Sequence, residues 1–330
     1  MSYRAFVVNK SGEEFTAGVA ELDESQLPAG DVTIRVEWSS VNYKDGLASS
    51  PTGRVVRSYP MTIGVDLAGR VTASNDARFK EGDAVVVTGY DLGVAHPGGY
   101  AELARVPGDW VVPLPNGLTA KEAMALGTAG FTAALSIHQL ERNGLTPANG
   151  PVLVTGSTGG VGSTAVSMLA GLGYTVAAST GKGSEHQFLR EIGATEILSR
   201  EDVSAESSRP LEGERWAAAV DPVGGATTSY LIRTTKYGGS IAVSGLTGGT
   251  AVNTTVLPFI LRGVSLLGID SVFCPMPLRR ATWDRLAGDL KPKGLLAAIA
   301  HEITLDGLAE ATQQILAAQV RGRFLVRVGD

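Results

Sequence analysis

The chain has 330 residues, of which 44% are hydrophobic and 18% charged, a composition typical of a folded globular protein with room for two domains. Its net charge of −5 is distributed in both signs, which does not indicate a nucleic-acid partner. The first residues lack the apolar core of a secretory signal, and no apolar run reaches the roughly 18 residues of a membrane span. We therefore expect no membrane association. The single cysteine, Cys274, excludes an intrachain disulfide and fits a cytoplasmic location.

The first 122 residues are predicted to be rich in β-strands. Residues 32–38 alternate apolar and polar side chains, as a half-buried strand does. Further strands are expected at residues 63–71, 84–88 and 110–114, and turns rich in Gly and Pro separate them. Short strands with regular breaks are typical of a β-barrel or sandwich.

The sequence pattern changes at Thr119, which we expect to cap a helix that runs to about residue 140, with Glu122 closing a capping box. Strand-like and helix-like segments then alternate, which predicts βαβ units and a parallel sheet. The strands are expected at residues 152–155, 175–178, 196–198, 217–220, 241–244 and 264–269, and the helices at 162–172, 185–192 and 227–235. A helix at 305–319 and a strand at 323–328 are expected to follow.

A glycine-rich segment between a predicted strand and a predicted helix is the most informative motif. Residues 152–162 read VLVTGSTGGVG, so the strand ends at Thr155 and glycines follow directly. This is the context of a dinucleotide-binding turn, in which glycines allow a tight turn and helix amides receive the pyrophosphate. Ser157 stands where the usual pattern has its first glycine. A purely structural turn would not account for four glycines within seven residues.

The end of the next predicted strand indicates which nicotinamide cofactor binds. An NAD site usually carries an acidic residue there for the ribose 2′-hydroxyl. This chain instead has Thr180, Gly181 and Lys182, and a hydroxyl with a cation suits a 2′-phosphate. The sequence therefore predicts NADPH, although Lys182 as a solvated surface lysine remains an alternative.

Several longer stretches make the chain resemble the medium-chain dehydrogenase/reductase superfamily over nearly its whole length. These stretches are residues 38–45 (WSSVNYKD), 127–133 (GTAGFTA), 258–262 (PFILR) and 268–272 (GIDSV). Together with the glycine motif they are similar to the quinone-oxidoreductase branch, and within it to NADPH-dependent acrylyl-CoA reductases. The resemblance implies an α/β fold, with a GroES-like β-barrel catalytic domain at residues 1–122 and 273–330 and a Rossmann domain of doubly wound parallel sheet at residues 123–272.

The resemblance also implies a reaction and a set of site residues. NADPH would reduce acryloyl-CoA to propanoyl-CoA by hydride transfer to the β-carbon and protonation of the α-carbon. Tyr43 would border nicotinamide and substrate and would be the catalytic residue. The remaining cofactor contacts would be Thr158, Gly159, Gly160 and Val161 for the pyrophosphate, Thr180, Gly181, Lys182 and Arg200 for the 2′-phosphate, and Leu246, Ile260 and Ser271 at the nicotinamide end.

Metal catalysis is not expected. One cysteine cannot form a structural zinc site, which takes about four ligands. In the alignment that the resemblance implies, Asn42 and Val65 stand where zinc dehydrogenases carry Cys and His ligands. Without a Lewis acid, alcohol oxidation is a poor hypothesis, whereas a thioester carbonyl already activates an alkene.

For several other candidate residues, a functional and a structural interpretation both stay open. A phenol holds its proton at neutral pH, so Tyr43 could act as an acid or could only pack against the cofactor. Lys44, Arg54 and Arg57 could meet the phosphates of coenzyme A or form a solvated surface. The histidines, which are His96, His138, His186 and His301, are expected at the surface, and Cys274 has no evident partner base.

Two alternatives to the acyl-CoA reaction stay open at this point. One is an NADPH-dependent reductase of quinones, enals or enones, and the other is an NADPH-binding protein without catalysis. By analogy with the superfamily we also expect a homodimer.

Overall fold

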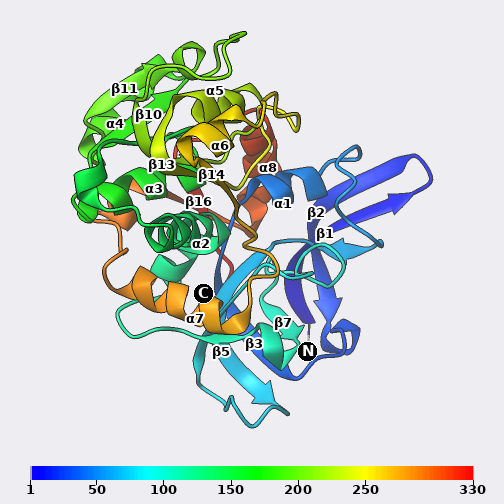
Figure 1. Cartoon of the computed structure of the whole chain (residues 1–330). Coiled ribbons are helices and arrows are strands. Elements are labelled where there is room, and N and C mark those ends of the chain that lie inside the picture. Colours follow the sequence, from blue (N-terminus) through cyan, green and yellow to red (C-terminus); the bar gives the residue numbers. More distant parts are fainter. Residues whose placement is uncertain (1, 330) are drawn as a thin grey trace. The chain divides into compact units, whose positions relative to one another are not determined.

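The computed structural model describes residues 2–329 and divides the chain into two compact units (Figure 1). The first contains the residues up to Thr128, Val272–Ala287 and the residues from Leu295 on. The second contains Ala129–Ser271 and Gly288–Gly294. No helix within residues 2–329 combines the length and apolar character that crossing a bilayer requires.

The first unit is built from mostly antiparallel strands. Within the described residues, one sheet has the order β15-β16-β3-β5-β6-β8, with β7 paired to β3, and a smaller sheet has the order β2-β1-β4. On β3 the side chains of Val32, Ile34 and Val36 are completely buried, so the predicted alternation is confirmed. The strands are β1 (Ser2–Ser11), β2 (Glu14–Asp23), β3 (Val32–Ser40), β4 (Met61–Thr62), β5 (Asp66–Ser74), β6 (Ala84–Thr88), β7 (Leu103–Val106), β8 (Val112–Pro113), β15 (Ala300–Thr304) and β16 (Arg323–Arg327).

The helices of this unit differ from the predicted ones at three places. Helix α7 (Met276–Ala287), like strands β1 and β2, was not predicted. The helix expected at 305–319 is a 3₁₀ turn followed by α8 (Leu308–Leu316), and Ala318 adopts a left-handed backbone (φ 55°) that is incompatible with a continuing helix. Short helix α1 (Tyr43–Ala48) follows β3.

Helix α2 (Ala120–Arg142) begins in the first unit and ends in the second. Its predicted capping box is present: the Thr119 amide donates to Glu122 Oε2 at 2.9 Å, and the Glu122 amide donates to Thr119 Oγ1 at 3.2 Å. The helix is kinked at Gly127, whose φ of 52° lies in the left-handed region. A Cβ at this position would lie within 2.5 Å of Ser40 Oγ and Asp66 Oδ2, so only glycine fits.

The second unit is a six-stranded sheet of parallel strands in the order β11-β10-β9-β12-β13-β14, counted within the described residues. Leu153, Ala219 and Ile241 belong to its buried core, which explains the near-continuous apolar strands of the sequence. The elements are β9 (Val152–Val154), α3 (Gly160–Gly171), β10 (Val176–Thr180), α4 (His186–Glu191), β11 (Glu196–Ser199), β12 (Trp216–Asp221), α5 (Ala226–Thr234), β13 (Thr235–Val243), α6 (Leu257–Arg262) and β14 (Ser265–Gly268).

The register of this sheet aligns the carboxyl ends of its strands. Val154 on β9 pairs with Ala178 on β10 and with Val220 on β12. Val243 on β13 pairs with Gly268 on β14. The loops that follow these strands therefore leave from one edge of the sheet, where open parallel sheets bind their ligands.

A buried polar network around Asp66 joins four segments of the first unit. Asp66 Oδ2 accepts hydrogen bonds from Ser40 Oγ (2.6 Å), Asn42 Nδ2 (2.7 Å) and the Thr128 amide (2.9 Å). Arg323 from β16 lies 3.6 Å from the same oxygen and also donates to Ser40 Oγ and to Asn42 Oδ1. The side chains of Asp66 and Arg323 are at most 2% exposed.

This network fixes the start of α1. Removing one partner of a buried ion pair typically costs about 3–5 kcal/mol, because the other charge stays buried without compensation. Asp66 and Arg323 each bond Asn42, the residue immediately before α1. The network therefore fixes the backbone position of the next residue, Tyr43.

Candidate cofactor and substrate sites

The glycine turn of the second unit leaves the carboxyl end of β9 and leads into α3. Gly156 has a positive φ of 54°, which glycine adopts without strain. A Cβ at Gly162 would lie 2.3 Å from the carbonyl oxygen of Gly156, so the helix packs directly on the turn. The two glycines thus perform the roles that the sequence motif predicts.

Ser157 takes a different role from the glycine it replaces. Its side chain is completely buried, and its hydroxyl donates to the carbonyl oxygen of Val154 (2.6 Å) and accepts from the Ser179 amide (3.1 Å). Its amide donates to the carbonyl oxygen of Ser179 (3.0 Å). The serine therefore ties the turn to β10, and the departure from the usual pattern is compatible with a stable turn.

The start of α3 fits a dinucleotide pyrophosphate. Gly159 precedes the helix, no side chain caps it, and Gly159, Gly160 and Val161 are partly exposed. The first helix amides, with the partial positive charge of the helix end, suit an anion. Thr158 is nearly buried, with its hydroxyl 3.4 Å from that of Thr180.

Cations surround the end of β10. The guanidinium of Arg200, which follows β11, lies against Gly181, because a Cβ on Gly181 would be 2.8 Å from its Nη2. The Lys182 amide donates to Thr180 Oγ1 at 3.0 Å, which shapes the turn. Burial lowers the pKa of Lys182, Glu185 opposes this, and Arg200 lowers the pKa further. An anion bound between the two cations would relieve their repulsion.

Most of the predicted cofactor residues in this unit lie in a row along the carboxyl edge. Arg200 follows β11, Thr180 ends β10, the glycine turn follows β9, Leu246 follows β13 and Ser271 follows β14. Leu246 is 60% exposed. Ile260 lies on α6, the helix that precedes β14, and is 68% exposed.

A second turn at this edge escaped the sequence analysis. Asp221 ends β12, is completely buried, and accepts hydrogen bonds from Thr155 Oγ1 (2.6 Å) and from the amides of Val223 (3.0 Å) and Gly224 (3.2 Å). A Cβ on Gly156 would lie 3.0 Å from Val223, so the two turns touch. An acidic residue followed by Pro and two Gly directly after a predicted strand is the signal that could have revealed it.

In the first unit, Tyr43 is the first residue of α1 and is 41% exposed. Asp45 lies beneath it, completely buried, and its carboxylate accepts from the Asn42 amide (2.8 Å) and the Val65 amide (3.0 Å). Burial and the neighbouring Asp66 raise the pKa of Asp45 to about 7, against the lowering effect of its hydrogen bonds. Asp45 therefore has a structural role, which is to hold the first turn of α1.

Asn42 and Val65, which stand where zinc dehydrogenases carry their ligands, do not provide a set of zinc donors. The Asn42 side chain is used by Asp66 and Arg323, and Val65 is a buried aliphatic residue. Within residues 2–329, no group of three or more His, Cys, Asp or Glu side chains is arranged to hold a metal ion. Of the four histidines, His186 is exposed, as expected, whereas His96, His138 and His301 are partly buried, and the ring of His96 lies 5.1 Å from that of Trp110.

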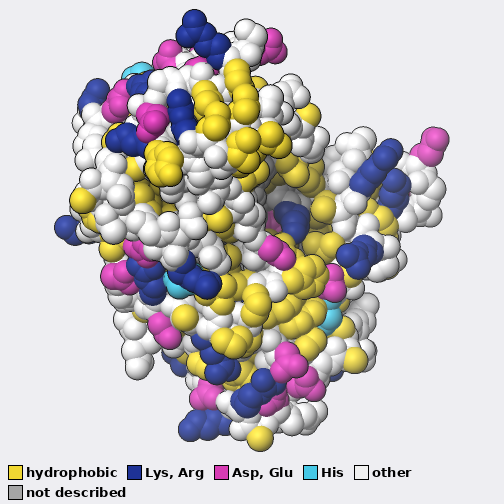
Figure 2. All heavy atoms as spheres, in the orientation of Figure 1, with side chains coloured by type: hydrophobic (Ala, Val, Ile, Leu, Met, Phe, Trp, Pro, Cys, Tyr) yellow, Lys and Arg dark blue, Asp and Glu magenta, His cyan; other side chains and the backbone are white. Residues whose placement is uncertain are grey.

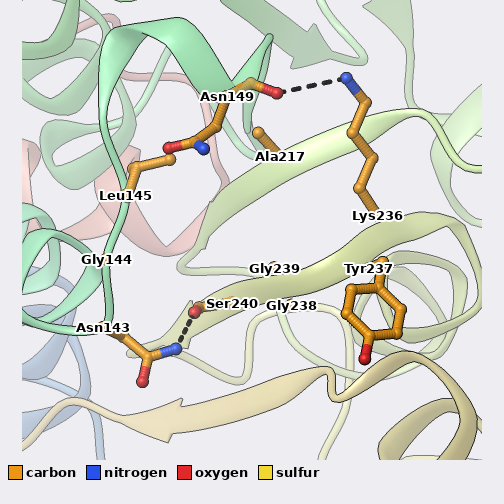
Figure 3. A pocket seen from close by; sticks show the side chains of 10 residues that line it. All are labelled: Asn143, Gly144, Leu145, Asn149, Ala217, Lys236, Tyr237, Gly238, Gly239 and Ser240. Carbon is orange, nitrogen blue, oxygen red and sulfur yellow. Dashed lines mark hydrogen bonds between the residues drawn. The ribbon is translucent and has the colours of Figure 1, made fainter.

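A hollow of about 110 Å³ lies at the other end of the second unit's sheet (Figure 3). Lys236 donates to the carbonyl oxygen of Asn149 (3.3 Å), and Asn143 donates to Ser240. Lys236 lies at the amino-terminal end of β13, and Ser240 pairs with Ser265, the first residue of β14. The hollow is thus remote from the carboxyl edge, where this fold binds nucleotides.

Known protein families match segments of both units. Residues 28–116 match the alcohol dehydrogenase GroES-like domain, and residues 160–287 match the zinc-binding dehydrogenase domain. The chain is 52% identical to the Bacillus subtilis protein YhfP, provisionally named a quinone oxidoreductase, over 99% of both chains. It is 50% identical to acrylyl-CoA reductase AcuI of Ruegeria pomeroyi, also over 99% of both.

Solved structures give the same result. The yhdH oxidoreductase of Salmonella enterica in complex with NADP superimposes with a TM-score of 0.96 at 48% identity, over 99% of this chain and 100% of that one. The yhfP structure from Bacillus subtilis, with NAD bound, gives a TM-score of 0.97 at 51% identity over 99% of both chains. The protein therefore belongs to the medium-chain dehydrogenase/reductase family, with a GroES-like domain and a Rossmann-type domain of parallel sheet.

Proposed function

We propose that this protein is an NADPH-dependent reductase of an activated carbon–carbon double bond, converts acryloyl-CoA to propanoyl-CoA, and uses no zinc. The observation that carries the cofactor assignment is the pair of cations at the end of β10. Lys182 and the guanidinium of Arg200 flank Gly181, where an NAD site would place an acidic residue. Charge-assisted bonds from both cations suit the 2′-phosphate.

The substrate assignment rests on the family relationship. AcuI of Ruegeria pomeroyi, at 50% identity, is named an acrylyl-CoA reductase, whereas the provisional name of YhfP supports a quinone reductase as the alternative. The lack of a zinc donor set around Asn42 and Val65 favours a substrate that is already polarised, because an alcohol would need a Lewis acid. The cytoplasmic location remains a prediction from the single cysteine.

The chemistry divides between cofactor and protein. NADPH, when bound, supplies a hydride for the β-carbon of the thioester. The helix start at Gly160 and the cations at Gly181 bind the phosphates of the cofactor. Tyr43, held by the network beneath α1, presents its hydroxyl to the substrate and gives a proton to the α-carbon.

The first prediction concerns the cofactor phosphate. Changing Lys182 to Glu should raise the KM for NADPH roughly 100-fold or more, because an attraction becomes a repulsion, while kcat changes about twofold at most. Steady-state kinetics with NADPH and NADH measure this. Lys236→Glu, at the other end of the sheet, is a charge-matched control. An equal loss with both cofactors would contradict the phosphate role.

The second prediction concerns the substrate. The kcat/KM for acryloyl-CoA should exceed that for acrolein and for a quinone, and a chelator should leave the activity unchanged. NADPH oxidation followed at fixed enzyme concentration provides the comparison. A thousandfold preference for the free enal would refute the acyl-CoA assignment, and loss of turnover with the chelator would refute zinc independence. Tight NADPH binding with no turnover of any acceptor would indicate a non-catalytic protein.

The third prediction concerns the proton donor. Tyr43→Phe should lower kcat roughly 100-fold, as expected when a general acid is removed, with little change in the KM for NADPH. Single-turnover kinetics with acryloyl-CoA measure the effect. Tyr237→Phe, a 77% exposed tyrosine of the second unit, is the control. A kcat within about twofold of the wild type would reduce Tyr43 to a packing role.

The fourth prediction concerns assembly, since we also propose a homodimer. Strand β14 is at an edge of its sheet, Leu266 on it is 43% exposed, and Ile260 and Leu261 on α6 are more exposed still. Figure 2 shows hydrophobic side chains gathered over the α6 region. Light scattering after size exclusion should give twice the mass of one chain. Leu266→Lys should shift it to the monomer and Leu296→Lys should not; a monomeric wild type would refute the proposal.

A further inference from the structure

Basic side chains lie on α1 next to Tyr43 and on the loop that follows this helix. Lys44 follows Tyr43 on α1, and Arg54 and Arg57 lie on the loop between α1 and β4. Lys10 near the end of β1 reaches the same loop, with its Nζ 3.5 Å from the carbonyl oxygen of Pro51. Figure 2 shows Lys and Arg side chains over this part of the unit. We call Lys10, Lys44, Arg54 and Arg57 the basic surface.

The loop that presents the basic surface is firmly anchored. A Cβ on Gly53 would lie 1.7 Å from the carbonyl oxygen of Leu47, so the loop backbone packs directly on α1. Val55 and Val56 pack against the buried core of the unit. Arg54 has a left-handed backbone, with φ at 53°, which turns the chain between Gly53 and the two valines. The cations therefore project outward from an ordered loop, and less conformational entropy is lost when they bind an anion.

The basic surface is not neutralised by nearby acids. Among the described residues, the ion pair recorded for it joins Arg57 to Asp91 at 4.0 Å, the outer limit of such a contact, and Arg57 stays 69% exposed. The Arg57 amide donates to the carbonyl oxygen of Val94, which holds Arg57 against the loop that carries Asp91. The chain as a whole has a net charge of −5, so this concentration of positive charge is local. Its charge complements a polyanionic ligand that approaches Tyr43.

We propose that the basic surface binds the diphosphate and the ribose 3′-phosphate of coenzyme A, and so makes the enzyme select acyl-CoA thioesters over smaller thioesters. This inference rests on the proposed function and identifies residues that provide its substrate specificity. The reacting alkene would lie at Tyr43, and the phosphates would lie at Arg54 and Arg57, which the anchored loop carries. Guanidinium groups suit this role because they bind phosphate oxygens in pairs.

A comparison of two substrates distinguishes binding of the coenzyme A phosphates from a general effect on activity. Acryloyl-pantetheine carries the same acryloyl thioester and the same arm as acryloyl-CoA but lacks the nucleotide and its phosphates. The double variant R54Q/R57Q should raise the KM for acryloyl-CoA roughly tenfold and leave the KM for acryloyl-pantetheine within about twofold, with kcat unchanged for both. In the wild type, added salt should raise the KM for acryloyl-CoA more than that for acryloyl-pantetheine, and the variant should lose this difference.

A second double variant controls for the loss of charge. R35Q/K80Q removes two exposed cations of the same unit at positions outside the basic surface and should behave like the wild type. An equal rise of KM for both thioesters in R54Q/R57Q, or no rise for acryloyl-CoA beyond that of R35Q/K80Q, would overturn the inference. Failure of the proposed function would look different, because the wild-type enzyme would then reduce neither thioester.

Discussion

The alignment of the parallel strand ends in the second unit is the constraint on which the candidate cofactor site depends. Adjacent strands pair in register, so segments from residues 156 to 271 are brought to one edge. The glycine turn supplies helix amides near the middle of this edge, and Lys182 and Arg200 supply charge toward one end. A shift of one strand by a single residue would turn its side chains to the opposite face of the sheet and misplace its loop.

The first unit uses charge in a different way. Asp66 and Arg323 are buried together, and the hydrogen bonds they share with Ser40 and Asn42 hold the start of α1. Such a network contributes little net stability compared with apolar packing, but breaking it is costly. Here the network fixes the position of Tyr43, because Asp66 and Arg323 both bond Asn42, the residue directly before it. On the basic surface, Lys10, Arg54 and Arg57 are exposed to solvent and Lys44 is half-buried.

The relatives show where the family varies. One solved structure at 48% identity contains NADP and another at 51% identity contains NAD, so overall similarity does not decide the cofactor. The proposed function assigns this decision to residues at the end of β10. In this chain Lys182 and Arg200 are the cations there, and the lowered pKa of Lys182 reflects burial beside a second cation. For the substrate, the corresponding role is the one proposed for Arg54 and Arg57.

Local sequence determined the elements whose signals are local. The alternation at residues 32–38, the capping box of Thr119 and Glu122, and the glycine turn were all predicted and are all present. Strand β2 was not predicted, because it has no fully buried residue and so lacks an apolar face. Strand β1 has buried side chains, among them Ala5, Phe6 and Val8, but was also not predicted. Helix α7 was missed because its charged residues include Arg279, which is completely buried through contacts with distant Thr88 and Val272.

The tertiary structure decided which residues meet. Sequence alone indicated a phosphate-binding turn and a cationic strand end, because glycine conformation and side-chain charge are properties of single residues. It could not show that Asp221 organises a second turn against Gly156, or that Asp66 and Arg323 meet across more than 250 positions. Those facts depend on strand order and register, which arise from packing between segments far apart in the chain.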